Sequence, residues 1–324
     1  FPMIAKREHT KNIDPLYNIA LKEAGLLDAN GKISQENKID LITVTEGPGL
    51  EPALWVGITF AESLGGIWDS PIIPVNHMEG HIVTSLISKE NSEENKEDSE
   101  ENSENLFIKK ISYPALALLI SGGHTELVKI NKLGEYEILG STRDDAVGEA
   151  FDKVARLLGM TYPGGPEISK YAEVRVLEKG NIPPLYPLPR PMLHSKDLDF
   201  SFSGLKTFVL YTLKKIPKIT EDDKKEIAYE FQNAVIEVLL AKTLEAGQKI
   251  GVKDLIIGGG VTANTQIREA FIKMAEQEDF NLHLPEKSLA GDNAFMIAIA
   301  GFLKYQREKK STTSAIRARG NLSL

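Results

Sequence analysis

The sequence predicts an α/β protein with two lobes, and three observations support this prediction. Short apolar runs typical of buried strands alternate with longer helical patterns, as in a parallel or mixed sheet whose strands are joined by crossover helices. The length of 324 residues suits two lobes better than one. With 42% apolar and 26% charged residues, the chain can bury a substantial core.

Residues 1–88 are predicted to form the first lobe. A polar helical pattern covers residues 12–26, and no strand precedes it. After it come a buried strand at 39–44, a Gly-Pro turn, an apolar helix at 52–67, a strand in PIIPVN, and a helix that begins with HMEGH and ends near Ser88. Because the chain opens without a strand, we expect the first strand or strands of this lobe to be missing and the natural gene to be longer.

Residues 89–105 are predicted to be a disordered acidic insertion, because NSEENKEDSEENSEN has no aromatic residue and cannot repay its ordering entropy. Residues 90–104 carry a net charge of -7 out of -8 for the whole chain. The remainder is therefore nearly neutral and can carry a basic patch. The stretch from Lys304 to Arg319, with six cations and one acid, is either an RNA contact or a solvated helix end and tail.

Residues 106–324 are predicted to form the second lobe, with the C-terminal helix as a candidate to return to the first. A β-hairpin lies in YPALALLISGGHTELVKI, with Gly-Gly at its turn. The following elements are a helix at about 145–158, a proline-rich irregular stretch at 162–193, a long helix at 224–250, a strand in KDLIIGGG, a helix from about Asn264, and a closing helix in AFMIAIAGFLKYQRE.

The composition narrows the possible chemistry and location. There is no cysteine, so a metal would have to be held by His, Asp or Glu side chains. No apolar run is long enough for a membrane helix, and the first residues do not have the pattern of a signal peptide. We therefore expect a cytoplasmic protein with no membrane partner.

His77 and His81 follow a predicted strand and are four residues apart, with Asn76 placed to cap the helix. Two imidazoles at this spacing can bind one metal ion, although one packed and one exposed histidine is the alternative. Asp292, just before the last helix, is a candidate third ligand or a helix cap. A zinc protease of the zincin type would need Glu directly after the first His, where this chain has Met78.

Three glycine-rich turns could bring a nucleotide close to the main chain, or could serve backbone geometry alone. They are Ser121-Gly122-Gly123, Pro163-Gly164-Gly165-Pro166 and Gly258-Gly259-Gly260. Asp152 and Asn264 lie where their side chains could bind ribose hydroxyls. Asp152 could instead pair with Arg156 one helical turn later.

Seven segments in register carry a resemblance to a known family. They are VNHMEGH, LISGGHTEL, GEAFDKVARLLG, YPGGP, DFSFSGLKT, GGGVTAN and GDNAFMIA. Together they closely resemble the tRNA N6-adenosine threonylcarbamoyltransferase family in its bacterial form, once labelled the O-sialoglycoprotein endopeptidase or glycoprotease family. The resemblance covers nearly the whole chain apart from the acidic insertion.

The resemblance implies an actin-like, hexokinase-like (ASKHA) fold and a specific reaction. Threonylcarbamoyl-AMP is the donor, and N6 of the adenosine 3' to the anticodon in tRNAs reading ANN codons is the acceptor. His77, His81 and Asp292 are similar to the family's metal ligands, with Fe(2+) the usual metal and Zn an alternative. The residues similar to its donor-binding set are Leu119, Ile120, Ser121, Gly122, Gly123, Asp152, Gly165 and Asn264, with Ser169 a further candidate. An actin-like paralogue subunit and a small ATPase subunit are the implied protein partners.

Two other functions remain as alternatives. A small-molecule kinase or carbamoyltransferase could use the same fold, since fold does not fix function. A catalytically inactive scaffold paralogue of the same complex would be expected to lose His77, His81 and Asp292, which are all present. The sequence identifies no side chain as the base that accepts the proton of the attacking amine.

Overall fold

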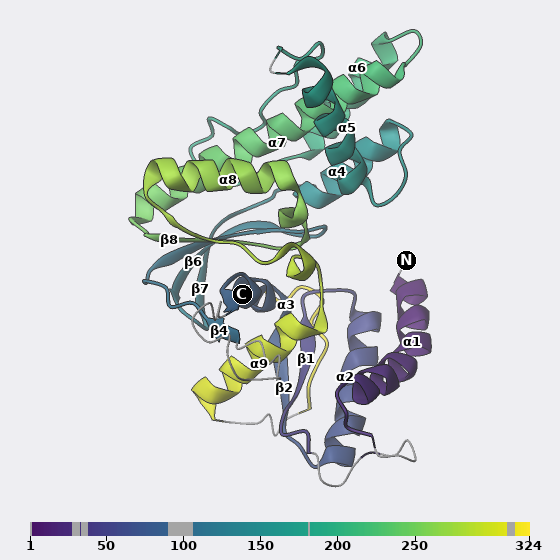
Figure 1. Ribbon diagram of the computed structural model, residues 1–324, viewed down its shortest axis with the longest axis vertical. Helices are drawn as coiled ribbons and strands as arrows, with labels where there is room; N and C mark the ends of the chain where they lie inside the picture. Colours follow the sequence, from purple (N-terminus) through teal and green to yellow (C-terminus); the bar gives the residue numbers. More distant parts are fainter. Residues whose placement is uncertain (1, 28–32, 34–37, 90–105, 181, 310–314) are drawn as a thin grey trace, which may run out of the picture. The chain divides into compact units, whose positions relative to one another are not determined.

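The computed structural model describes residues 2–27, 33, 38–89, 106–180, 182–309 and 315–324. The chain forms two compact units, Phe1–Gly80 with Asn293–Leu324, and His81–Asp292 (Figure 1). These units divide the chain at other positions than the predicted lobes 1–88 and 106–324. The predicted disorder of the acidic insertion concerns residues that, from 90 to 105, lie outside the described ranges.

In its described residues, the first unit contains a two-stranded parallel sheet, three whole helices and the start of a fourth. Its elements are α1 (Pro2–Glu23), β1 (Ile42–Gly47), α2 (Glu51–Trp68), β2 (Ile72–Asn76) and α9 (Ala294–Glu308). Trp68 Nε1 donates to Tyr17 Oη at 2.8 Å, which ties α2 to α1. The C-terminal helix α9 packs on both strands. At Gly301 there is no room for a side chain, since a Cβ placed there would lie only 2.3 Å from Thr43 Cγ2. The glycine lets this helix approach the sheet closely.

The second unit is built on a five-stranded mixed sheet of order β7-β6-β5-β8-β9. The strands are β5 (Ala115–Ile120), β6 (Thr125–Lys132), β7 (Glu135–Ser141), β8 (Asp254–Gly258) and β9 (Asn281–His283). The predicted hairpin is confirmed as the antiparallel pair β5 and β6. Every residue of β5 and β8 is buried, as expected for central strands covered on both faces. A separate short pair joins β3 (Ile87–Lys89) to β4 (Leu106–Ile108).

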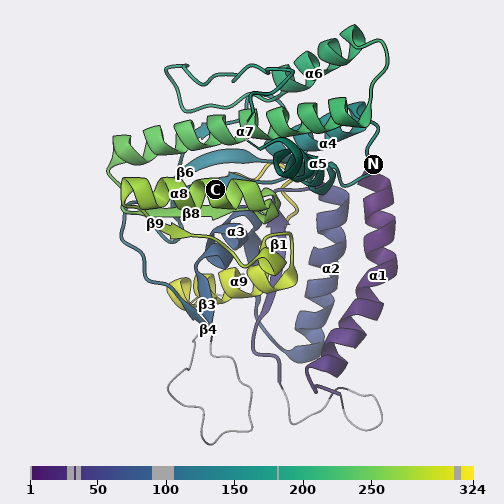
Figure 2. The ribbon, with the colours of Figure 1, turned by 45° about the horizontal axis from the view of Figure 1, so that its top comes forward.

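The helices of the second unit are α4 (Val147–Leu157), α5 (Gly164–Lys179), α6 (Ser203–Lys215), α7 (Glu221–Ile250) and α8 (Thr265–Glu278). The short 3-10 helices η1 (Gly260–Ala263) and η2 (Lys287–Leu289) complete it. Figure 2 shows α7 and α8 side by side along the sheet. The apolar faces of α4, α6 and α7 meet β5 and β8 in one large core. Helix α3 (His77–Ser85) carries the chain from the first unit into the second.

The prediction that residues 162–193 are irregular was wrong for α5. Pro163 is the N-cap residue and Pro166 lies in the first helical turn. Main-chain N–H groups in that turn have no acceptor within the helix, so proline removes no hydrogen bond there. The helix then continues to Lys179 and ends at Gly180, which has a φ of 60°. Helix α6, within and after DFSFSGLKT, was not predicted.

The irregular segment 182–202 follows α5 and is held along α7 by hydrogen bonds to buried charged side chains. Glu226 accepts from Leu185 N at 3.2 Å, and Glu230 accepts from Leu188 N at 3.0 Å. Further along α7, Lys242 donates to Ser195 Oγ at 2.8 Å and to the carbonyl of Asp197. Because this segment is neither helix nor strand, its main-chain N–H and carbonyl groups need other partners, and these side chains provide some of them.

Candidate metal centre and nucleotide cavity

The start of α3 places the two histidines. Asn76 Oδ1 accepts from Met78 N at 2.9 Å, which confirms the predicted helix cap. His77 and His81 therefore occupy successive turns of one helix. The side chain of Met78 is 1% exposed and belongs to the core, so the residue beside His77 offers no general base.

His77, His81 and Asp292 offer ligand atoms that all lie within 4.8 Å of one another. His81 Nε2 is 3.2 Å from Asp292 Oδ1, with the imidazole buried and the carboxylate exposed. The cap of α9 is Asn293, whose Oδ1 accepts from Met296 N at 2.8 Å, so Asp292 does not serve as the cap. Two imidazoles and one carboxylate fit a divalent transition metal with open coordination positions.

Gly258, at the end of β8, lies close to the backbone of His81. A Cβ placed on Gly258 would lie 2.9 Å from the His81 carbonyl oxygen. Ser85 Oγ also donates to this carbonyl, at 2.9 Å, and to Ile257 O at 3.1 Å. The close approach and the hydroxyl bridge fix the second turn of α3, and with it the His81 ring, against β8.

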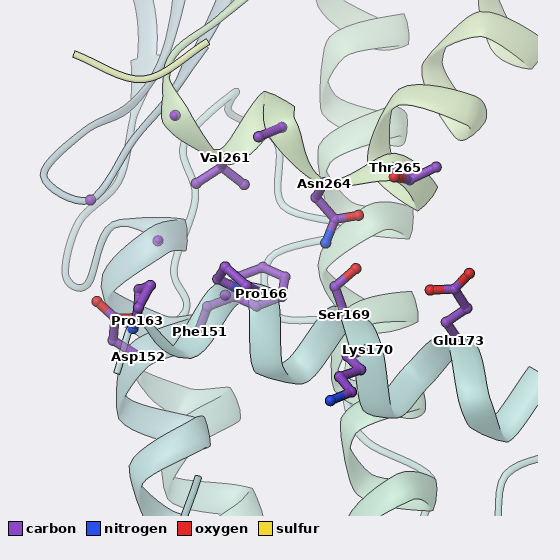
Figure 3. A pocket seen from close by; sticks show the side chains of 15 residues that line it. Phe151, Asp152, Pro163, Pro166, Ser169, Lys170, Glu173, Val261, Asn264 and Thr265 are labelled. Carbon is purple, nitrogen blue, oxygen red and sulfur yellow. The ribbon is translucent and has the colours of Figure 1, made fainter. Parts of the chain in front are cut away.

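The His81–Asp292 unit contains a cavity of about 430 Å³ (Figure 3), a size typical of small-molecule sites. Figure 3 shows η1 and the start of α8 on one side and α5 on the other. Its wall includes Gly122, Asp152, Gly165, Ser169 and Asn264, all predicted from the sequence. The other lining residues are Gly148, Phe151, Pro163, Pro166, Lys170, Glu173, Gly260, Val261, Ala263 and Thr265.

Four residues of the predicted donor set are not on the wall of this cavity. The side chains of Leu119 and Ile120 are fully buried at the end of β5. Ser121 Oγ accepts from Gly123 N at 3.3 Å and from His124 N at 3.1 Å, so the hydroxyl holds the turn together. In this turn, as the structure describes it, the N–H of Gly122 has no acceptor within the protein. Gly122, unlike the other three residues of the segment 121–124, lines the cavity.

Asp152 joins α4 to the start of α5. Its Oδ1 accepts from Gly164 N at 2.7 Å, and no ion pair with Arg156 forms among the described residues. A Cβ on Gly164 would lie 2.8 Å from Asp152 Cα, so the two helices approach too closely there for a larger residue. At Gly165 a Cβ would meet nothing within 4 Å, because this residue faces the cavity.

Asn264 is fixed by two hydrogen bonds at the start of α8. Its Oδ1 accepts from Ile267 N at 3.0 Å as the helix cap, and its Nδ2 donates to Gln232 Oε1 at 2.7 Å. In Figure 3 its amide group faces the hydroxyl of Ser169 across the cavity. A ligand between them would meet one polar group from each wall.

Lys170 and Glu173, which lie with Ser169 on α5, were not predicted from the sequence. Their spacing on a helix would have indicated a shared wall, but the proline-rich stretch was predicted to be irregular. Gly148 was also missed. A Cβ there would lie 2.7 Å from Ser121 O, so this glycine lets the start of α4 support the turn at Gly122.

The cavity reaches the segment that carries Asp292. A Cβ placed on Gly260, in the cavity wall, would lie 3.9 Å from Gly291 Cα. Gly291 directly precedes Asp292. A group bound in the cavity beside Gly260 would therefore lie near the carboxylate that pairs with His81.

The fold is shared with solved structures of low sequence identity. HypF from T. kodakarensis aligns over 86% of this chain and 42% of its own, with a TM-score of 0.52 and 16% identity. Full-length HypF in a phosphate- and nucleotide-bound form aligns over 84% and 40%, with a TM-score of 0.54 and 12% identity. This chain thus spans about two fifths of those proteins. The likeness concerns the fold alone and agrees with the predicted actin-like α/β class.

Sequence comparison places the chain in a family. The family model described as tRNA N6-adenosine threonylcarbamoyltransferase matches residues 1–95 and 101–299. Relatives of that name from Paraburkholderia xenovorans and Herminiimonas arsenicoxydans are each 44% identical, over 94% of this chain and 80% of their own length. These matches confirm the resemblance that the seven segments indicated. The chain belongs to the tRNA N6-adenosine threonylcarbamoyltransferase family.

Proposed function

We propose that this protein transfers the threonylcarbamoyl group of threonylcarbamoyl-AMP to N6 of the adenosine 3' to the anticodon in tRNAs reading ANN codons. The observation that carries the proposal is the closeness of Gly260 to Gly291, which brings a nucleotide-sized cavity to the carboxylate of Asp292. Negative charge develops on the phosphate as the acyl bond to it breaks, so an enzyme that releases AMP needs a positive charge close to the nucleotide, and a metal ion held by Asp292 and the two histidines would supply it there.

The cavity walls supply the groups that would hold the AMP part of the donor. Gly122 N and the first-turn amide of Gly165 are main-chain donors for phosphate or hydroxyl oxygens. Ser169 and Asn264 face each other from opposite walls and would orient the nucleoside between them. The hydrogen bonds of Asn264 to α8 and Gln232 fix it in advance, so little entropy is lost when the donor binds.

His77, His81 and Asp292 would hold one metal ion, Fe(2+) or Zn(2+), in the proposed enzyme. Such an ion supplies a positive charge that favours departure of the phosphate. The protein contributes a fixed helical spacing for the two imidazoles and a carboxylate that is not used as a helix cap. No described side chain is assigned as the base for the amine proton.

The proposal extends to the surroundings of the enzyme. Among the described residues, no helix has the length and apolar character needed to cross a membrane. We expect the protein to work in the cytoplasm, where its tRNA substrate is found. We also expect an actin-like paralogue subunit and a small ATPase subunit as partners, on the basis of the family resemblance.

A transfer assay tests the proposal. The protein, with its expected partners, is given labelled threonylcarbamoyl-AMP and an unmodified tRNA that reads an ANN codon. Label should enter the tRNA with wild-type protein and fall to background in a His77→Ala/His81→Ala variant. A Lys249→Ala/Lys273→Ala variant, which changes two exposed lysines away from both sites, serves as the control. Absence of transfer by the wild-type complex would exclude the proposed function.

A further inference from the structure

The outer face of α6 is a basic surface that the proposed active site does not use. Residues 200–220 contain four lysines and no acidic residue, within a chain of net charge -8. The lysines are Lys206, Lys214, Lys215 and Lys218. None of them forms an ion pair in the part of the chain that the structure describes. Their positive charge is therefore available to a partner.

Two aromatic side chains lie on the same outer face. The buried face of α6 is formed by Leu205, Val209 and Leu213, which join the main core. On the other side, Phe208 is 43% exposed and Tyr211 is 57% exposed. Lys214 Nζ lies 5.5 Å from the centre of the Tyr211 ring. Large exposed aromatic residues between free lysines are a pattern typical of surfaces that bind nucleic acid.

The position of α6 suits contact with a large ligand. The helix lies at the edge of its unit in both ribbon views (Figure 1, Figure 2). Its first turn is anchored, because Asp144 Oδ1 accepts from Phe202 N at 2.8 Å and from Ser203 N at 3.1 Å. Burial opposes ionisation of Asp144, but these bonds and those from the hydroxyls of Ser201 and Ser203 leave its pKa below the usual value. The patch is thus presented on a fixed helix.

A purely structural role explains only part of this surface. Lys214 and Lys215 lie in the last turn of α6, where cations stabilise the helix dipole. The dipole gives no reason for Lys218, beyond the helix, or for two exposed aromatic rings. By contrast, the basic stretch 304–319 is partly engaged within its own unit. Lys304 donates to Pro74 O at 2.8 Å, and Arg319 lies 3.7 Å from Glu46.

We propose that the outer face of α6 binds tRNA, with its lysines on backbone phosphates and Tyr211 and Phe208 against unpaired bases. This inference rests on the proposed function, which makes a tRNA loop the substrate. Unpaired bases in RNA loops stack on aromatic side chains, and lysines that neutralise phosphates make the binding salt-dependent. The charge of the patch complements RNA, whereas most of the chain is acidic or neutral.

The test measures binding of fluorescently labelled, unmodified tRNA to the full chain by anisotropy at several salt concentrations. In a Lys214→Ala/Lys215→Ala variant, the slope of log affinity against log salt should fall by about 1.5, because two phosphate contacts are lost. A Tyr211→Ala variant should bind about fivefold or more weakly with an unchanged salt slope. The Lys249→Ala/Lys273→Ala variant removes the same charge from exposed lysines on α7 and α8, and should match wild type.

The outcomes separate this inference from the proposed function. If the α6 charge variant binds tRNA as the control variant does, the surface is not an RNA contact, and an acidic protein surface becomes its expected partner. If tRNA binding depends on α6 but the wild-type complex transfers no label, the proposed reaction fails while the RNA surface stands. Thermal unfolding of each variant shows whether weaker binding comes from lost contacts or from a damaged helix.

Discussion

Asp292 Oδ1 lies 3.2 Å from His81 Nε2, while the next residue, Asn293, caps α9. The sequence left both the ligand and the cap role open for Asp292, and the structure gives the cap to Asn293. The cap stabilises the helix through Met296 N, and the carboxylate is left to face the histidine. This separation makes the metal hypothesis testable by single substitutions.

Asp292→Ala should lower metal content without destabilising α9. We expect metal affinity to fall by more than about tenfold, since even residues that only support a ligand contribute that much. Asn293→Ala should instead cost about 1 kcal/mol of unfolding free energy through loss of the cap. Elemental analysis of the purified variants and urea unfolding measure the two effects. Equal metal content in Asp292→Ala and wild type would remove Asp292 from the ligand set.

Asn264→Asp should separate the structural and ligand roles of this residue. Aspartate keeps the acceptor that caps α8 but leaves the buried Gln232 Oε1 without its donor, so we expect a loss of about 1–3 kcal/mol in stability from that bond alone. It loses the donor to Gln232 and adds a negative charge to the cavity wall, so the affinity for AMP should fall about tenfold or more. Asn264→Ala should lose the cap as well. Calorimetric titration with AMP would contradict the assignment if all three proteins bound equally.

Gly148→Ala should disturb the turn at Gly122. The new Cβ would lie 2.7 Å from Ser121 O and 2.9 Å from Gly122 Cα, so the turn must move. We expect a loss of about 1–3 kcal/mol in stability and weaker AMP binding. Gly204→Ala is the matched control in α6, where a Cβ meets nothing within 4 Å. That variant should be as stable as wild type or more stable, by up to about 1 kcal/mol.

Glu226 should make the stability of the second unit depend on acid pH. Burial opposes its ionisation, but Lys179, Leu185 N and Arg175 together hold the pKa of Glu226 below the ordinary value of 4.5. A lowered pKa in the folded state means that the carboxylate stabilises the fold above about pH 4.5 and that this contribution is lost as the pH falls.

Glu226→Gln should remove that part of the pH dependence and cost about 3 kcal/mol at neutral pH, because buried Arg175 loses its charged partner. Urea unfolding between pH 3 and pH 7 measures both quantities. Glu178→Gln, which removes an exposed partner of Lys225, is the control and should change stability by less than about 1 kcal/mol. A parallel pH profile for wild type and Glu226→Gln would show that Glu226 is not the group responsible.

The sequence predicted the elements whose patterns are long or strongly alternating. The β5–β6 hairpin was found because apolar alternation and a Gly-Gly turn mark it locally, and α7 because a long run of helix-forming residues has no proline in it. Helix α5 was missed because two prolines suggest irregular backbone, and only their positions at the N-cap and first turn make them compatible with a helix. The three-residue strand β9 is too short to carry a pattern of its own.

The candidate site was predicted in part for a similar reason. The metal ligands and the donor set lie in motifs with a chemical signature; the structure brings His77, His81 and Asp292 together, and half of the donor set lines the cavity. Glu173 and Gly148 have no such signature, because their importance comes from the elements packed against them. Leu119 and Ile120 share a motif with Gly122, but they point to opposite faces of β5, and both side chains are buried because both faces of this central strand are covered.

The path of segment 182–202 depends on side chains of α7. Glu226, Glu230 and Lys242 each bind a main-chain group of that segment, and every residue type except proline offers the same N–H and carbonyl. Tyr186 and Arg190, which are only partly exposed, add side-chain bonds to α7. Replacements among its exposed residues should therefore leave the backbone in place. The exposed side chains of this segment can therefore change widely in evolution as long as Glu226, Glu230 and Lys242 are retained. A relative whose sequence differs in this segment can still have the same backbone path.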